Sequence, residues 1–262
     1  MIDDYEMLKT RCAELNKYSS MKAIQILEVL SCCTESESIA KIAEVSGLSS
    51  STVHRILQDL VSTEYVLKDS NHKYSLSLNA MALGTRIRKT DIITNASESE
   101  MEKLNNITLE TIHLIILDNF QGRYIAKLDA KNQIGLRSRV GWNIPLHCTA
   151  GGKVLLAYQT EEWLKTFFLS PMKRYTEKTI VTEEAMRKEL KDIRDCGYGM
   201  DNLEHNPDVL CIAAPIFDAN GKVVATIGVS APSYRFSYEK ALSYKDDVVN
   251  SANNISARLR QI

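Results

Sequence analysis

The feature that most constrains this chain is a pattern of two short helices joined by a tight turn between Ser38 and Leu60. Apolar residues recur there at three- and four-residue spacing, as they do on the buried face of a helix. Gly47 lies between the two runs and lacks the Cβ that disfavours positive φ, and Ser49 is placed to cap the second helix. The pattern therefore predicts a helix-turn-helix whose buried residues are Ile39, Ile42, Ala43, Val53, Ile56, Leu57 and Leu60.

The second of these helices is polar on its opposite face. A helix over residues 50–61 that lies in a major groove would present such side chains to base edges and phosphates. The same spacing also occurs in small helical domains that bind no nucleic acid, so the motif alone leaves both interpretations open. The candidate DNA-contacting residues on this helix are Ser50, Ser51, Thr52, His54 and Arg55.

A predicted β-hairpin follows the two helices. Residues 65–68 and 73–78 have the composition and alternation of strands, and the turn-forming residues 69–72 join them. With a supporting helix over residues 20–30, this order of elements is that of a winged helix, whereas a simple three-helix bundle would not need the hairpin. The hairpin therefore favours DNA binding, and its tip adds Asn71, His72 and Lys73 as candidates for contact with the DNA backbone or minor groove.

Charge argues mildly in the other direction. The formal net charge of the chain is −1, and residues 19–80 carry five lysine and arginine residues against seven acidic ones. Such a balance makes tight non-specific binding to nucleic acid unfavourable, but it permits a sequence-specific reader whose few cations cluster at the groove.

The 262 residues are enough for two domains, and the second half has a different pattern from the first. Apolar strands are predicted over residues 111–117, 123–128, 135–140, 209–217 and 223–231, and helices over 92–109, 161–169, 182–196 and from about 237. This mixture predicts an α+β domain with an antiparallel sheet. We therefore divide the chain into residues 1–78, a winged helix-turn-helix domain with an N-terminal arm at 1–18; residues 79–91, a linker helix; and residues 92–262, a ligand-binding domain.

The six cysteines do not form a disulfide framework or a C-x-x-C motif, and no apolar run reaches the length of a membrane span. These features predict a cytoplasmic protein in a reducing compartment. Four residues, His147, Cys148, His205 and Cys211, have the chemistry of metal ligands or of a nucleophile and its base. Their spacing matches no structural zinc site, and nothing in the sequence specifies an oxyanion hole. We predict no metal, no cofactor and no catalytic residue.

Motifs in both halves resemble the IclR family of bacterial transcriptional regulators. They are Ile42-Ala43, Gly47-Leu48, Ser51 to Leu57, Leu60, Tyr65-Val66 and Tyr74 in the first half, and Arg137, Val140-Gly141, Pro145-Leu146-His147, Gly152-Lys153, Leu155 to Ala157, Gly197-Tyr198, Asp201, Glu204-His205, Cys211 to Asp218, Gly221, Val229-Ser230 and Pro232 in the second. The resemblance implies a winged-helix domain that reads double-stranded operator DNA, a GAF/PAS-like domain that binds a small metabolite, and a homodimer or homotetramer. The sequence departs from the family pattern at Glu64 and Ser77, where glycines are common, and at Leu67, where a basic residue is common.

The resemblance also implies an effector-binding site. Its positions correspond to Ala150, Gly151, Asp201, Val209, Cys211, Gly228 and Ser230. The small residues at 150–152 would leave backbone N–H groups of a helix N-terminus open to an anion, and Cys211 and Ser230 would add hydrogen bonds. These residues predict a small organic acid as effector, hydroxylated or aromatic. The alternative is that Gly151 and Gly152 only allow close helix packing and that Cys211 is a buried core thiol.

Together these patterns predict a ligand-responsive transcriptional regulator. The alternative is a metabolite-binding protein or an enzyme whose N-terminal module mediates protein contacts. The two differ in whether the chain binds DNA selectively and whether it consumes its ligand.

Overall fold

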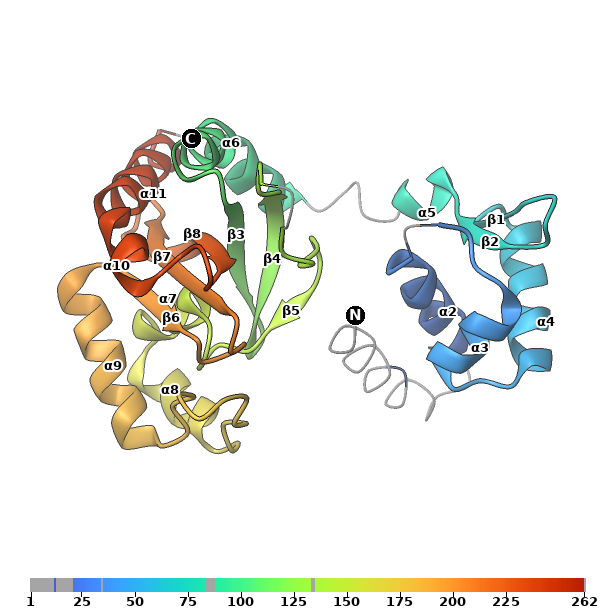
Figure 1. The fold of residues 1–262 in the computed structure, drawn as a ribbon, viewed down its shortest axis with the longest axis horizontal. Coiled ribbons are helices and arrows are strands. Elements are labelled where there is room, and N and C mark those ends of the chain that lie inside the picture. Colours follow the sequence, from blue (N-terminus) through green and yellow to red (C-terminus); the bar gives the residue numbers. More distant parts are fainter. Residues whose placement is uncertain (1–11, 13–20, 34, 83–87, 133–134, 262) are drawn as a thin grey trace. The chain divides into compact units, whose positions relative to one another are not determined.

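The computed structural model describes residues 12, 21–33, 35–82, 88–132 and 135–261. The chain divides into two compact units, residues 1–87 and 88–262, each with its own apolar core (Figure 1). The predicted N-terminal arm lies outside the described residues except for Cys12, and so does the middle of the predicted linker helix. On either side of that gap, the structure has a short helix that ends at Ala82 and a long helix that begins at Arg88.

The first unit is a three-helix core followed by a two-stranded hairpin. Helices α3 and α4 pack through apolar residues that the sequence pattern selects, whereas α2 contributes Ile26, Val29 and Leu30 and leaves Ile24 44% exposed. Tyr74 of the hairpin is buried with them. A bridge between Glu37 and Tyr74 ties the hairpin to the segment before α3. Its elements are α2 (Lys22–Ser31), α3 (Ile39–Ser46), α4 (Ser50–Ser62), β1 (Val66–Lys68), β2 (Tyr74–Leu76) and α5 (Leu78–Ala82).

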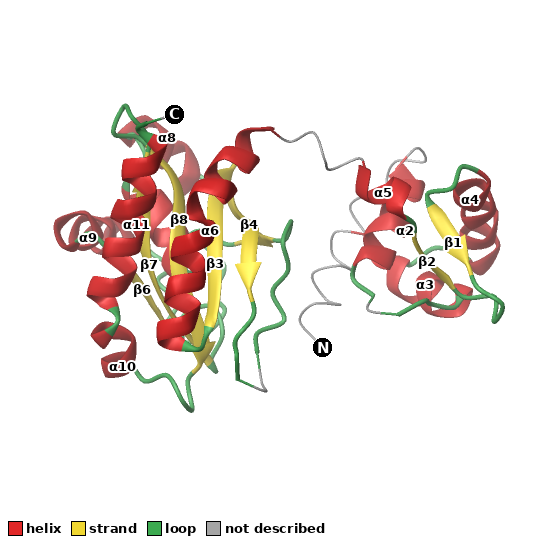
Figure 2. Ribbon diagram, turned by 90° about the horizontal axis from the view of Figure 1, so that it is seen from above, coloured by secondary structure: helices red, strands yellow, loops and turns green. Residues whose placement is uncertain are grey.

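The second unit is a six-stranded antiparallel sheet with the order β5-β4-β3-β8-β7-β6 and helices on both faces. Figure 2 shows α6 and α11 side by side over one face, and α7 packs on the other face, with α9 against it. Its elements are α6 (Arg88–Thr108), β3 (Thr111–Asp118), β4 (Gln121–Leu128), β5 (Asn143–Ile144), α7 (Ala150–Ala157), α8 (Glu161–Phe168), α9 (Glu183–Cys196), β6 (Gly199–Asn202), β7 (Val209–Phe217), β8 (Val223–Pro232), α10 (Tyr238–Ser243) and α11 (Lys245–Leu259).

Alternation along the strands separates two apolar cores. On β3, Ile112 and Leu114 face the core beneath α6 and α11, whereas Ile115 faces the core beneath α7. A β-bulge at Leu114/Ile115 interrupts the pairing of β3 with β4. Helices therefore cover both faces of an antiparallel sheet, and the structure confirms the predicted fold class, an α+β domain.

The predicted strand over residues 135–140 is wrong. This segment has no strand assignment, and the carbonyl groups of Leu136 and Ser138 accept hydrogen bonds of 2.7 Å each from Lys127 Nζ. An ammonium group therefore occupies carbonyls that a strand would offer to a neighbouring backbone. The short strand β5, which the sequence did not predict, pairs with β4 instead.

None of the helices in the described ranges has the length and apolar character needed to cross a membrane.

Candidate functional site

Helix α4 separates its residues into a buried and an exposed face, as the sequence predicts. The buried residues are Val53, Ile56, Leu57 and Leu60. On the exposed face lie Ser50, Ser51, His54 and Arg55, whereas Thr52 is half-buried. Four of the five candidate side chains on this helix are therefore open to a partner.

The N-terminus of α4 is held by hydroxyl groups. Ser49 Oγ accepts a hydrogen bond of 3.3 Å from the Thr52 backbone N–H, as the predicted cap. The same oxygen lies 2.9 Å from Thr52 Oγ1 and 3.1 Å from Ser51 Oγ. The preceding helix ends at Gly47 with φ of 70°, the left-handed conformation that the turn requires. Thr52 thus belongs to the cap as much as to the exposed face.

Arg55 has only a loose partner on its own helix. Its Nη1 lies 3.7 Å from Asp59 Oδ2, and both side chains are 71% exposed. An exposed pair at this distance contributes little, so the guanidinium can reach a phosphate or a guanine edge at small cost.

A buried glutamine that the sequence analysis did not single out supports this arrangement. Gln25 of α2 is fully buried, and its Nε2 donates to the carbonyl groups of Cys12 at 3.0 Å and Ser46 at 2.6 Å. The second bond holds the end of α3 just before the turn into α4. The sequence did not mark Gln25, because the apolar face of this helix was predicted from Ile24, Leu27 and Leu30, whereas the structure buries Gln25 with Ile26, Val29 and Leu30.

The wing is a short hairpin with an exposed tip. Asp69 Oδ1 accepts hydrogen bonds of 2.9 Å from the backbone N–H groups of Asn71 and Lys73. These bonds, with one from Ser36, lower the pKa of Asp69. Asn71, His72 and Lys73 are exposed, and His72 has a positive φ of 58°. The tip therefore offers three polar side chains on a turn fixed by one carboxylate.

Two departures from the family pattern have structural explanations at the base of the wing. Glu64 has a φ of 60°, the left-handed conformation for which glycine is favoured. Ser77 donates its hydroxyl to the Glu64 carbonyl and its backbone N–H to the Tyr65 carbonyl. The serine thus fastens the strained residue in place.

In the second unit, the predicted effector residues on the strands share one face of the sheet. Asp201 of β6 is paired in register with Cys211 of β7, and Cys211 is paired with Ser230 of β8. Two residues along the strands, Val209 and Gly228 lie on the same face because side chains alternate. Asp201 and Ser230 are 2% and 7% exposed. The sheet register therefore brings these five positions together beneath α7.

The remaining two positions begin α7. Thr149 caps the helix by accepting a 3.2 Å hydrogen bond from the Gly152 N–H. A Cβ on Gly151 would lie 2.6 Å from Ile115 Cδ1 and 2.7 Å from Thr226 Oγ1, so only glycine allows this close approach of α7 to the sheet. Gly228 is also packed closely, since its Cβ would lie 2.7 Å from the Ile212 carbonyl oxygen. Gly151 therefore has the packing role that was the alternative to a binding role, and Gly228 is packed in the same way.

The sheet face beneath α7 also holds an aromatic pair that the sequence analysis missed. His113 of β3 and Tyr124 of β4 have ring centroids 4.4 Å apart. Burial lowers the pKa of His113 to about 3, with a further contribution from Lys127. Burial also raises the pKa of Tyr124, and the acidic groups of Cys211 and Asp201 add to this shift. Both rings are therefore uncharged at neutral pH. Only an alternating strand pattern marked His113 in the sequence.

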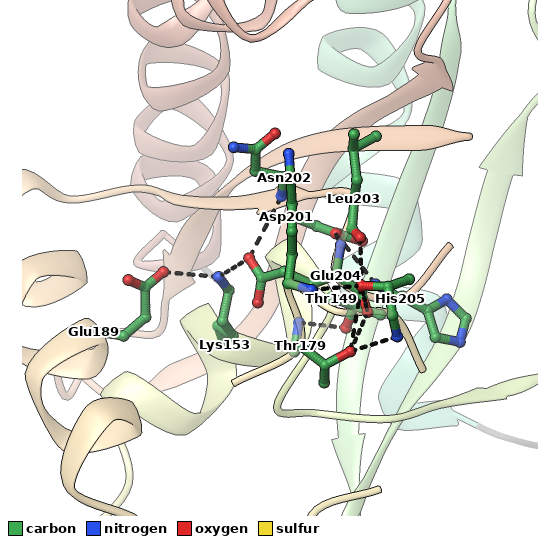
Figure 3. A network of polar contacts seen from close by, with 12 residues as sticks. Thr149, Lys153, Thr179, Glu189, Asp201, Asn202, Leu203, Glu204 and His205 are labelled. Carbon is green, nitrogen blue, oxygen red and sulfur yellow. Dashed lines mark hydrogen bonds and ion pairs between the residues drawn. The ribbon is translucent and has the colours of Figure 1, made fainter. Parts of the chain in front are cut away.

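A buried lysine joins α7, α9 and the loop after β6 (Figure 3). Lys153 Nζ lies 2.6 Å from Glu204 Oε1 and 2.7 Å from Glu189 Oε1, and the lysine side chain is 1% exposed. Burial alone would lower the pKa of this ammonium, but the two carboxylates outweigh it and raise the pKa. The network thereby fixes the loop that carries Glu204.

Asp201 holds the same loop from the side of the sheet. Its Oδ1 accepts hydrogen bonds from the backbone N–H groups of Glu204 at 2.7 Å and His205 at 3.4 Å. Burial nevertheless raises the pKa of Asp201 to about 7, with a contribution from the nearby Glu204 carboxylate. Burial likewise raises the thiol pKa values of Cys148 and Cys211. Near neutral pH this cluster holds protons, which reduces its repulsion of an anionic ligand.

Comparison with known proteins assigns both units. The family model for the IclR helix-turn-helix domain matches residues 19–70, and the model described as bacterial transcriptional regulator IclR C-terminal matches residues 84–257. The chain belongs to the IclR family.

Individual members of the IclR family resemble the chain over nearly its whole length. The HTH-type transcriptional regulator KdgR of Escherichia coli (strain K12) is 38% identical over 245 residues, 92% of either chain. The crystal structure of the Thermotoga maritima IclR has a TM-score of 0.78 and 30% identity, covering 92% of this chain and 98% of that one.

A second solved structure shares only the fold. An IclR homolog from Microbacterium hydrocarbonoxydans, complexed with 4-hydroxybenzoate, has a TM-score of 0.77 and 21% identity, and this comparison covers 92% of this chain and 98% of that one.

As an IclR-family protein, the chain is a ligand-responsive transcriptional regulator with a helix-turn-helix DNA-binding domain and a ligand-binding C-terminal domain.

Proposed function

We propose that α4 enters the major groove of operator DNA and that the wing contacts the DNA backbone. The contacts would come from Ser50, Ser51, Thr52, His54 and Arg55 of α4 and from Asn71, His72 and Lys73 of the wing. The observation that carries this proposal is the polar, exposed face of α4 opposite four buried apolar residues. Groove contacts need side chains that lie outside the protein's own core, as the exposed residues of α4 do.

In the second unit, we propose that a small organic acid binds beside the start of α7 and against the polar face of the sheet. Backbone N–H groups at a helix N-terminus favour an anion, and the raised pKa of Asp201 reduces the competing negative charge. The contacting residues would be Ala150, Gly151, Asp201, Val209, Cys211, Gly228 and Ser230. Binding of the acid would change the free energy with which the protein binds DNA, and the protein would leave the acid chemically unaltered.

The proposal includes a homodimer or homotetramer that acts in the cytoplasm. A dimer presents two recognition helices to two operator half-sites, so a ligand that alters their spacing alters operator affinity. Light scattering of the purified chain, with and without DNA, measures the molar mass and therefore the number of chains in the assembly. A monomer bound to a single half-site would contradict it.

The DNA-binding proposal is tested by measuring the binding of purified full-length protein to the DNA upstream of its own gene and of neighbouring genes. We expect a selective, salt-sensitive complex whose stability changes with one member of a panel of small carboxylates. Arg55→Ala should weaken specific binding by about 1–3 kcal/mol, or roughly 5- to 150-fold. Arg260→Ala, at an exposed arginine of the second unit, is the matched control.

Three results would contradict the proposal. Operator binding by Arg55→Ala at parental affinity would remove Arg55 from the interface. An absence of selective binding at low salt would exclude the operator-reading role of α4. Consumption of an acid from the panel would favour an enzyme.

A further inference from the structure

His113 is the centre of a hydrogen-bonded chain on the sheet face beneath α7. The residue is 2% exposed. Its Nδ1 lies 3.2 Å from Ser230 Oγ on β8, and its Nε2 lies 2.6 Å from Ser138 Oγ in the segment between β4 and β5. The imidazole thus joins a proposed effector residue to a segment outside the sheet.

The sheet register places His113 at a particular point of the proposed site. His113 is paired with Gly228 of β8, which has no side chain, and the adjacent pair is formed by Thr111 and Ser230 two residues along. A residue that faces a glycine across the strands meets no opposing side chain. His113 therefore supplies the polar group at the position where Gly228 supplies none.

The imidazole can present Ser230 in two ways. Because burial keeps His113 neutral, one ring nitrogen donates a hydrogen bond and the other accepts one. When Nδ1 donates to Ser230, the serine hydroxyl can donate to a ligand in place of the neighbouring Cys211 sulfur, to which Ser230 is also hydrogen-bonded. When Nδ1 accepts from Ser230, the serine oxygen can accept from a ligand hydroxyl. In the first case Nε2 accepts a hydrogen bond from the Ser138 hydroxyl, and in the second case Nε2 donates one to Ser138 Oγ.

A strip of buried hydroxyl groups connects this point with the start of α7. Within the described residues, Thr111 Oγ1 and Thr226 Oγ1 are buried and have no hydrogen-bond partner. Thr226 Oγ1 lies beside Gly151 in the first turn of α7, and Thr111 is paired with Ser230. A buried hydroxyl that stays unpaired destabilises the folded chain. Thr111 therefore offers an unpaired hydroxyl beside Ser230, whereas Thr226 lies under the first turn of α7, where the close packing at Gly151 leaves no room for a ligand atom.

The length of this strip limits the ligand. Gly151 packs on Ile115, which is two residues from His113 along β3. Side chains two residues apart on one face of a strand are separated by about 7 Å. That span matches an acid whose second polar group is at the far end of the molecule from its carboxylate.

We infer that His113 is a specificity-determining residue which, through Ser230, recognises a distal hydroxyl or carbonyl group of the effector. The effector class is then a bifunctional organic acid, with its carboxylate at the start of α7 and its second polar group at the His113–Ser230 pair. This inference rests on the proposed effector site in the second unit.

The test compares matched acids by isothermal titration calorimetry with the full-length protein. The pairs are pentanoate with 5-hydroxypentanoate and benzoate with 4-hydroxybenzoate. The 2-hydroxy isomers place the same hydroxyl beside the carboxylate and serve as positional controls. We expect the distal hydroxyl to tighten binding at least tenfold in one or both pairs and the proximal hydroxyl to leave it within threefold.

Three variants separate recognition from packing. His113→Phe keeps an aromatic ring beside Tyr124 but removes both nitrogens, so the preference for the distal hydroxyl should fall below threefold while the parent acid binds as before. His113→Gln keeps one donor and one acceptor group and should restore part of the preference. Ser251→Ala, at a buried hydroxyl of α11 on the other side of the sheet, should leave the preference unchanged. Tryptophan fluorescence confirms that each variant is folded.

The outcomes separate this inference from the proposal on which it rests. If the parent acids bind but the distal hydroxyl adds nothing, or if the preference survives in His113→Phe, the role of His113 is refuted and the acid-binding site stands. If His113→Phe is unfolded, the preference in His113→Gln decides: a preference below the parental one in a folded protein supports recognition, and a fully parental one refutes it. If no acid binds, the acid-binding proposal fails together with the inference, whatever the result of the DNA-binding experiment.

Discussion

The two units of this chain place their candidate functional side chains in opposite environments. Ser50, His54 and Arg55 of the winged-helix unit are exposed on one helix, whereas Asp201 and Ser230 of the effector unit are buried between a sheet and α7. DNA is a large partner that side chains must reach outward to meet, and a small molecule is recognised by groups that water does not reach. Substitutions in the first site should therefore change binding alone, and substitutions in the second should change stability as well.

The largest expected effect comes from the buried ion pairs. Lys153→Met leaves the Glu204 carboxylate buried without its charged partner, and we expect the effector unit to lose about 3–5 kcal/mol of unfolding free energy. Both tryptophans, Trp142 and Trp163, lie in that unit, so urea unfolding followed by tryptophan fluorescence reports on it. Lys165→Met, at an exposed lysine of α8, should stay within about 0.5 kcal/mol. Equal midpoints for the two variants would show that the pairs contribute nothing.

The matching test in the winged-helix unit is Leu57→Ala. Leu57 is fully buried in the helical core, and its truncation should cost about 2–5 kcal/mol. Operator binding should be lost at a lower temperature than in the parent, while the tryptophan unfolding transition stays in place. Leu67→Ala, at a leucine that is 56% exposed on the wing, is the control. A parallel shift of the tryptophan transition would mean that the units do not unfold independently.

The stability of the effector unit should also depend on pH, through Asp201. Burial raises its pKa from 3.8 to about 7, so the folded chain retains a proton that the unfolded chain has released in that range. The contribution of this group to stability is therefore fully present below pH 4 and is lost as pH rises towards 7. At about 1.4 kcal/mol per pKa unit, this amounts to at most about 3 kcal/mol between pH 5 and pH 8.

Asp201→Asn removes this contribution. Urea unfolding of parent and variant at pH 5 and pH 8, followed by tryptophan fluorescence, should show a smaller loss of stability in the variant as pH rises. A loss of the same size in both proteins would mean that the Asp201 carboxyl titrates normally.

The smallest expected effect is at the start of α4. Ser49→Ala removes the side-chain acceptor for the Thr52 N–H and should lower the stability of the winged-helix unit by about 1 kcal/mol. Thermal unfolding followed by loss of operator binding measures it. Ser62→Ala near the end of the same helix, where the hydroxyl only bonds back to Asp59 O, should change stability by less than about 0.5 kcal/mol. If both variants behave alike, the cap has no special role.

The sequence predicted best those features that depend on neighbouring residues. The cap at Ser49 and the left-handed Gly47 were predicted correctly because each depends on residues within one turn of helix. The segment 135–140 was misread because its carbonyls bond to Lys127, which lies on a strand rather than within the segment. The residues of the segment itself say nothing about such a partner.

The same distinction separates the two candidate sites. The candidate DNA-contacting residues were predicted from one helical period and one hairpin turn, and the candidate strand residues of the effector site were predicted from family resemblance rather than from any local pattern. Neither kind of pattern identified His113, because its partner Ser230 is 117 residues away and nothing near His113 in the chain indicates the pairing.

By itself, the sequence determined the helix-turn-helix, the wing, and the alternation that makes a two-faced sheet, because these follow from helical and strand periodicity and from local capping. Only the tertiary structure decided which buried polar groups meet. The antiparallel register put Asp201, Cys211 and Ser230 in one row, and the packing of α7 against α9 put Lys153 beside Glu189. The physical reason is that burial makes an unpaired polar group costly, so these partners are chosen by the fold as a whole and not by the residues beside them.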